Sequence, residues 1–441
     1  MHLGTELSVW SVVPFVGLLL SIAILPLVTP HFWEHNRNKG IVAALFSAPV
    51  VIYLLAGFGE RGAHELALKG EEYTAFILLL ASLYVITGGI YVRGSLSGTP
   101  LVNTVVIAIG TVLASVIGTT GASVLLIRPL LAANASRQRT THIVVFFIFS
   151  VSNCGGLLTP LGDPPLFLGF LKGVPFDWTF RLWRGWLLVN GVLLVIFNVW
   201  DQIVFAREER ERPGAQLEEV QRHAPLGIDG LHNFGFLAGI VAVIYASGRG
   251  FGTGGAAWPF GVQEGLMLAL AAASYAATDK RIRRNNQFGF APINEVALLF
   301  AGIFVTMAPA LLLLNANAQS FGLRSPAQFF WATGILSSFL DNAPTYLTFA
   351  ATACGLAGVS LEGRYLGEFL ARGAESAALL AAISCGAVFM GANTYIGNGP
   401  NFMVKAIAEE RGVPMPSFFG YMLYSGAVLI PLFVVVTLVF F

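Results

Sequence analysis

The chain has 441 residues, of which 56% are hydrophobic and only 11% are charged, and its mean hydropathy is +0.73. Soluble domains carry about 25% charged residues, so this composition excludes a soluble globular protein and predicts a chain that is surrounded by lipid. The formal net charge of +1 gives no indication of a nucleic acid partner.

The first half, residues 1–206, is a series of apolar segments long enough to cross or enter a bilayer. The fourth segment is interrupted by polar residues from Thr119 to Ser123, which predicts a re-entrant hairpin. The fifth contains Gly156-x-x-Thr159-x-x-Gly162-Asp163-x-Pro165, and its glycines and prolines disfavour a continuous helix, so we expect a broken helix. The segments are residues 9–28, 41–58, 74–92, 101–133, 142–171 and 186–206.

A polar stretch, residues 207–231, is predicted to be a cytoplasmic linker. The second half, residues 232–441, then repeats the same order of elements. Its hairpin segment is interrupted from Asp341 to Thr345, and its broken segment contains Gly391-x-x-Thr394-x-x-Gly397-Asn398-x-Pro400, which matches the first motif without a gap. The segments are residues 232–247, 258–277, 291–314, 327–357, 374–409 and 418–441.

This repetition predicts an all-α polytopic membrane protein with two inverted-topology repeats of five spans each, and with a re-entrant hairpin and a broken helix in each repeat. An odd number of crossings would place the second repeat upside down relative to the first. Lysine and arginine are more frequent in the loops that this topology assigns to the cytoplasm, most sharply at residues 280–284. We therefore expect a multi-pass protein of the inner (plasma) membrane, whose first apolar run is a retained span.

Ionisable side chains are unfavourable inside a bilayer and mark functional sites there. Asp163 and Asp341 lie at two of the interruptions, one in each half, and we expect them to hold Na⁺ between them. Hard cations prefer oxygen ligands, and neighbouring neutral side chains supply them. These are Asn153, Thr159, Asn342, Thr345, Asn393, Thr394 and Asn398. The tip of the first hairpin is expected at Thr119, Thr120 and Ser123. Alternatively, both aspartates only brace the breaks through hydrogen bonds to nearby backbone.

Other polar residues have more than one interpretation. Arg128 lies in a hairpin, where it would pair with a carboxylate, extend to the interface or bind an anionic substrate. We interpret Glu295 and Glu375 as acids near helix starts, and His142 as a residue of the membrane boundary. Cys154, Cys354 and Cys385 lie in apolar segments and are interpreted as small hydrophobic residues. The sequence has no P-loop and no recognisable catalytic constellation, so we expect neither ATP as the driving force nor an enzyme.

Two stretches carry a resemblance to a known group. Ser152-Asn153-Cys-Gly-Gly with Gly162-Asp163-Pro-Pro, and Ser337-Ser-Phe-Leu-Asp-Asn-Ala-Pro-Thr345, resemble the ion transporter superfamily. Within it, the chain is similar to NhaD-type sodium/proton antiporters and to citrate transporters of the CitMHS type. The resemblance implies a homodimer formed through a scaffold domain. The ion-site positions that it implies are Ser152, Asn153, Thr159, Asp163, Ser337, Asp341, Asn342, Thr345, Asn393, Thr394 and Asn398.

The first hairpin, Thr119-Thr120-Gly121, departs from the superfamily pattern because it has no Asn or Asp. We expect a secondary transporter, namely a Na⁺(Li⁺)/H⁺ antiporter in which the two ions compete for buried carboxylates. It would need no cofactor beyond the transported Na⁺. The alternative is a Na⁺- or H⁺-coupled transporter of citrate, a dicarboxylate or another oxyanion such as arsenite. A channel or receptor would not require the duplicated breaks, and an intramembrane enzyme would require a constellation that is not found.

Overall fold

The computed structural model describes residues 3–94, 97–211, 227–254 and 258–441. Nearly all regular structure in these ranges is helical, and nine of the described helices are long and apolar enough to cross a membrane. The chain is therefore an all-α, multi-pass membrane protein, as predicted. One small sheet adds to the helices: Tyr91–Arg93 (β1) pairs antiparallel with Gly227–Asp229 (β2), which joins the segment before the first hairpin to the end of the polar linker.

The helices of the first half follow the predicted apolar segments. They are the 3-10 helices η1 (Leu3–Thr5) and η2 (Val9–Val12), then α1 (Val13–Val28), α2 (Pro30–Trp33), α3 (Asn36–Phe58), α4 (Glu60–Thr87), α5 (Pro100–Ile117), α6 (Thr119–Ala133), α7 (Thr141–Ser150), η3 (Cys154–Leu158), α8 (Pro164–Leu171), η4 (Trp178–Leu182) and α9 (Trp183–Glu211). The last of these continues past residue 206 into the predicted linker, whose residues 212–226 lie outside the described ranges.

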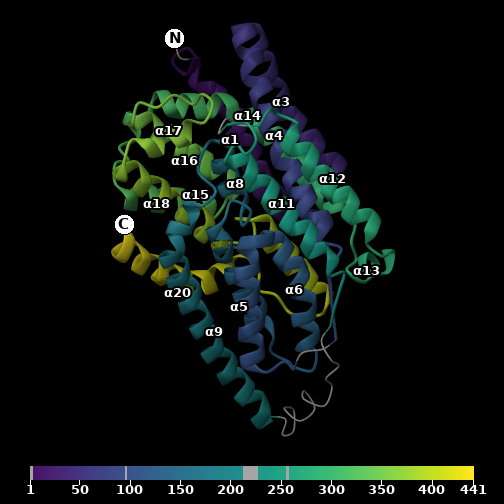
Figure 1. The fold of residues 1–441 in the computed structure, drawn as a ribbon. Coiled ribbons are helices and arrows are strands. Elements are labelled where there is room, and N and C mark those ends of the chain that lie inside the picture. Colours follow the sequence, from purple (N-terminus) through teal and green to yellow (C-terminus); the bar gives the residue numbers. More distant parts are fainter. Residues whose placement is uncertain (1–2, 95–96, 212–226, 255–257) are drawn as a thin grey trace.

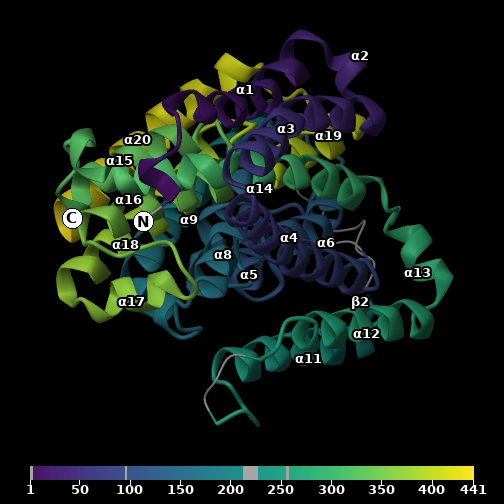
Figure 2. The ribbon, with the colours of Figure 1, turned by 90° about the horizontal axis from the view of Figure 1, so that it is seen from above.

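The second half has a comparable series. Its helices are α11 (His232–Gly248), α12 (Val262–Ala277), α13 (Lys280–Asn285), α14 (Ala291–Ala316), η5 (Ala318–Phe321), α15 (Pro326–Ser337), α16 (Asn342–Leu356), α17 (Tyr365–Ala371), α18 (Ala374–Met390), η6 (Gly391–Asn393), α19 (Gly399–Glu410) and α20 (Phe418–Phe440). Figures 1 and 2 show α11 and α12 side by side along one edge of the molecule, joined to the body through α13.

The helices form two sets by their packing. The framework helices, α1, α3, α4, α11, α12 and α14, pack on one another. The inner helices are the two helical pairs α5–α6 and α15–α16, the interrupted helices α7–α8 and α18–α19, and α9 with α20. The sets meet where α4 contacts α6 and α8, and where α14 contacts α16.

Burial separates the interrupted helices from the lipid-facing ones. The span Thr141–Leu158 is 89% buried inside the molecule, whereas Asn36–Phe58 is 22% buried. A backbone that is not fully helical is tolerated at membrane depth only where protein covers it or where it lines a cavity. The first break is therefore positioned by the helices that surround it.

The hairpin interruptions are narrower than predicted. Thr119 to Ser123 was expected to be non-helical, but α6 begins at Thr119 and the chain reverses at Gly118, whose φ of +83° favours glycine. Likewise α16 begins at Asn342, with Asp341 as its N-cap. The reason is that short polar side chains are favoured at helix starts, so a polar cluster in an apolar segment begins the next helix instead of lengthening the loop.

Candidate functional site

The first break lies between α7 and α8 and contains the short helix η3. Close packing requires glycine here, because a Cβ on Gly155 would lie 2.7 Å from the Thr111 carbonyl oxygen and 2.8 Å from that of Ser150. Asp163 ends the break as the N-cap of α8, yet its side chain makes no capping hydrogen bond. The carboxylate is therefore directed away from its own helix.

The second break, between α18 and α19, has the same construction. Asn398, which matches Asp163 in the duplicated motif, is the N-cap of α19, and its side chain also makes no capping hydrogen bond. Its amide donates to Asp163 Oδ1 at 3.1 Å and to the Ser152 carbonyl at 3.2 Å. The two breaks thus meet through corresponding residues, although these are separated by more than half of the chain.

Both hairpins also contact the Asp163 carboxylate. Thr119 Oγ1, at the start of α6, donates to Asp163 Oδ1 at 3.0 Å, and Asn342 Nδ2, at the start of α16, donates to Asp163 Oδ2. The Asp163 side chain is 1% exposed, and no Lys, Arg or His of the described chain forms an ion pair with it. Its charge is therefore met only by neutral donors, which leaves it able to bind a cation or a proton.

A second pair of contacts is repeated in the two halves. The Thr159 hydroxyl donates to the Ser115 carbonyl, and the Thr394 hydroxyl donates to the Ser338 carbonyl at 2.5 Å. Each threonine oxygen then accepts a backbone N–H from two residues further along, at 3.1 Å in the first half and 3.2 Å in the second. These threonines therefore fasten each break to the hairpin of its own half.

Several amide oxygens near the breaks are buried and have no hydrogen-bond partner in the described structure. They are the Oδ1 atoms of Asn153, Asn342 and Asn393. The orientation of Asn342 follows from chemistry, since its amide nitrogen faces an acceptor-only carboxylate. Buried polar atoms are normally satisfied, so each of these three oxygens is available to accept a hydrogen bond or to bind a cation.

One group of oxygens converges on Gly391. A Cβ added there would lie 3.2 Å from Asn153 Oδ1, 3.3 Å from the Gly397 carbonyl oxygen and 3.6 Å from Ser337 Oγ. The first two distances are tighter than ordinary contact, so a side chain at residue 391 would displace these oxygens, and the glycine allows them to lie close together. Hydroxyl, amide and carbonyl oxygens are the ligands that hard monovalent and divalent cations prefer, and this set fits Na⁺.

Asp341 plays a different part from Asp163. Its Oδ1 accepts the Ala343 N–H at 3.0 Å, and its carbonyl accepts the Thr345 hydroxyl at 2.9 Å. These contacts are those of the alternative, bracing role, and the expectation that Asp341 also holds Na⁺ stays a prediction. Asn342, its neighbour, is the residue that reaches Asp163.

The remaining predicted residues lie around the first hairpin. Ser123 and Ser152 share a hydrogen bond of 2.9 Å, while Thr120 lines a cavity of about 80 Å³ with Thr119 and Asp163. The opposite wall of this cavity comes from framework helices α4 and α14, including Tyr84 and Pro292. Asp163 is therefore at the boundary between the two helix sets.

Sequence reasoning missed residues that hold the site together. The Asn401 amide donates to the Gly391 and Thr394 carbonyls at 2.9 Å each, and its oxygen accepts from Asn153 at 2.6 Å, which bridges the two breaks. Its position one helical turn after Asn398 was a usable signal. No such signal was available for Ser115 and Ser338, because a serine inside an apolar helix most often hydrogen-bonds to its own backbone.

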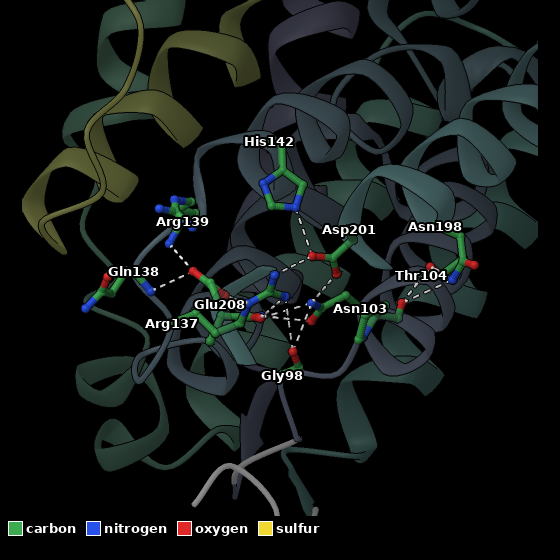
Figure 3. A network of polar contacts seen from close by, with 12 residues as sticks. Gly98, Asn103, Thr104, Arg137, Gln138, Arg139, His142, Asn198, Asp201 and Glu208 are labelled. Atoms are coloured by element: carbon green, nitrogen blue, oxygen red, sulfur yellow. Dashed lines mark hydrogen bonds and ion pairs between the residues drawn. The ribbon is translucent and has the colours of Figure 1, made fainter. Parts of the chain in front are cut away.

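His142 is not the simple boundary residue that was expected. Its Nε2 lies 2.8 Å from Oδ1 of Asp201, a fully buried residue of α9 (Figure 3). Asp201 also forms an ion pair with Arg137 at 2.7 Å and accepts a hydrogen bond from the Asn103 amide at 2.9 Å. Arg137 reaches on to Glu208 at 3.1 Å. This network fastens the base of the first hairpin to α7 and α9, remote from the breaks.

Comparison with known proteins identifies the group to which these features belong. A search of the curated proteins found no match. A family model, CitMHS_2, described as "Putative citrate transport", matches residues 4–441. Since this match covers nearly the whole length, the chain belongs to that family, and it is a membrane transporter rather than an enzyme.

Proposed function

We propose that the protein is a secondary transporter that couples the movement of a citrate-like carboxylate to the movement of Na⁺. The observation that carries the cation part is the convergence of Asn153 Oδ1, Ser337 Oγ and the Gly397 carbonyl on the space beside Gly391. Asn153 Oδ1 is buried and has no hydrogen-bond partner among the described residues, and Asp163 adds a negative charge nearby through its contact with Asn398. Such a set favours a hard cation over an anion.

The carboxylate part is supported by the family description. An anion would not approach the uncompensated Asp163 carboxylate unless a cation had been bound first. Binding of Na⁺ at the breaks would therefore precede binding of the carboxylate, and this order would couple the two movements. In this proposal the substrate would enter the cavity between the hairpin and the framework helices, which Asp163 lines.

The repeated contacts support inverted repeats as the basis of alternating access. The pairs Asp163–Asn398 and Thr159–Thr394 occupy matching positions of the duplicated motif and make corresponding contacts. In this proposal the inner helices move against the framework helices. The two repeats, residues 1–206 and 232–441, exchange conformations in this movement. We further propose a location in the plasma membrane and a homodimer, following the loop charges and the superfamily resemblance.

A second candidate is Na⁺(Li⁺)/H⁺ antiport. The observation that favours it is that Asp163 meets only neutral hydrogen-bond donors while it lines a cavity. A proton and Na⁺ would then compete for the same carboxylate, and this competition would be sufficient for exchange.

Purified protein in proteoliposomes separates the two candidates. Labelled citrate uptake is measured with an inward Na⁺ gradient and with choline in its place, and lumenal pH is followed with a dye. Uptake of citrate that requires Na⁺ supports the first candidate. Collapse of a pH gradient by Na⁺ or Li⁺ in the absence of citrate supports the second. Vesicles without protein are the control, and failure of both assays overturns both candidates.

A further inference from the structure

We propose that the cavity around Arg128 is a second binding site, which takes a carboxylate group of the substrate before it reaches Asp163. This inference rests on the proposed transport of a carboxylate. The cavity has a volume of about 260 Å³. It lies between inner helices α6 and α19 on one side and, on the other, the end of α4 and the loop that leads from α13 into α14.

The guanidinium inside this cavity is not ion-paired within the part of the chain that the structure describes, although Glu410 also lines the cavity. Arg128 Nη2 donates to Gln287 Oε1 at 2.9 Å, and Arg128 forms no ion pair with any carboxylate of the described chain. A guanidinium has five N–H donors in a planar fork. The neutral Gln287 occupies part of that fork, so the cation remains available to an anion from outside. Pairing with a carboxylate, one of the sequence-based alternatives for Arg128, is not found among the residues that the structure describes.

The Arg128 cavity adjoins the cavity of Asp163. Tyr84 and Pro292 line both of them, so the two spaces share a wall on the framework side. Both are bounded on the other side by the first hairpin, through Arg128 and Val124 in one and Thr119 in the other. A small molecule held at Arg128 would thus be placed beside the route to the breaks.

The chemistry selects a carboxylate. Arginine recognises the two oxygens of a carboxylate through parallel hydrogen bonds, which a single point charge cannot do. Glu410 is exposed at the rim of the same cavity. Its negative charge opposes that of the substrate, which would keep the bound state short-lived, as a site on a transport route requires.

Citrate uptake by the full chain in proteoliposomes tests this site. In Arg128→Gln, loss of the charged contact should raise the citrate KM about tenfold, with the maximal rate changed less than about twofold. Arg128→Lys keeps the charge but not the fork, and it should give an intermediate KM. Arg372→Gln removes an exposed charge that pairs with Glu368 and does not line the cavity, and it should leave the KM within about twofold of wild type.

A second variant does not depend on how well the hairpin tolerates a change at Arg128. In Gln287→Glu, a carboxylate of the chain faces the guanidinium and competes with the substrate, so the citrate KM should again rise, whereas Glu410→Gln should lower it. An unchanged KM in both Arg128→Gln and Gln287→Glu, in protein that transports citrate, overturns this site alone. Wild-type protein that neither binds nor transports citrate overturns the proposed function instead.

Discussion

Asn398 donates a hydrogen bond to Asp163, so the two residues at the matching position of the duplicated motif contact each other at the centre of the molecule. One of the pair is charged and the other is neutral. The protein thus has a single acid where an exactly repeated motif would place two carboxylates within hydrogen-bond distance, an arrangement in which both cannot stay ionised. At this position of the motif, the charge therefore comes from the first half of the chain.

The first prediction concerns the pair of Asp163 and Asn398. Asp163→Asn removes the charge and turns an acceptor of three hydrogen bonds into a group that must also donate, and a charge-assisted contact is worth about 3 kcal/mol. Cation-driven uptake in proteoliposomes should therefore fall about 100-fold. The double variant Asp163→Asn with Asn398→Asp returns the acid to the same contact from the other half, and it should recover part of the rate. Full activity of Asp163→Asn would remove this carboxylate from the mechanism.

The space beside Gly391 gives a second prediction, measured without transport. A ligand that binds only the folded state stabilises it, by about 2.7 kcal/mol at 100 times its dissociation constant. Na⁺ should therefore raise the unfolding temperature of the purified protein. Loss of the Asn153 oxygen in Asn153→Ala should raise the Na⁺ concentration needed for half of this effect about tenfold.

The matched control for that measurement is Asn198→Ala. Asn198 lies on α9 and donates to Thr104 at 2.9 Å, remote from the breaks, so its Na⁺ response should equal that of wild type. If Na⁺ stabilised Asn153→Ala and the wild-type protein at the same concentrations, Asn153 would not be a ligand.

The sequence predicted the fold well because lipid imposes a simple rule. Each span needs a long apolar segment, and the predicted segments correspond to helices from α1 to α20. The breaks were also predictable, since glycine and proline in such a segment disfavour a helix. The length of the non-helical stretch in each hairpin could not be predicted, because Thr119 and Asn342 are equally suitable for a loop and for a helix start.

The candidate site was predictable in its composition but not in its contacts. The motif indicated that Asp163 and Asn398 correspond, yet their hydrogen bond depends on how two breaks approach each other in space. The contacts of Asp341 could not be predicted either, because a carboxylate at a break and a carboxylate that caps a helix have the same local sequence. The contact between His142 and Asp201 joins residues far apart in the chain, and no periodicity in the sequence relates them.

Asp201 provides a third prediction, which concerns stability. Asp201→Asn leaves Arg137 and His142 buried without their shared acid, although Arg137 keeps Glu208. Breaking a buried ion pair destabilises a protein by about 3–5 kcal/mol, so thermal unfolding in detergent should shift markedly downward. Glu211→Gln, on the same helix, breaks exposed pairs with Arg139 and Arg207 and should change stability by at most about 1 kcal/mol. Equal shifts in the two variants would contradict a special role for the buried network.

The last prediction concerns Glu72 of α4. Its carboxylate forms ion pairs with Lys172, at the end of α8, and with Lys69, at 3.0 Å. The pair with Lys172 links a framework helix to an inner helix. Both lysines are buried, so Glu72→Gln leaves two like charges without their ion-pair partner and should destabilise the protein by about 3–5 kcal/mol in thermal unfolding. Glu368→Gln, which breaks an exposed pair with Arg372, should have an effect of at most about 1 kcal/mol. Adding Lys172→Met to Glu72→Gln removes one of the uncompensated charges and should recover part of the loss. If Glu72→Gln unfolds at the wild-type temperature, this cluster does not hold the two sets of helices together.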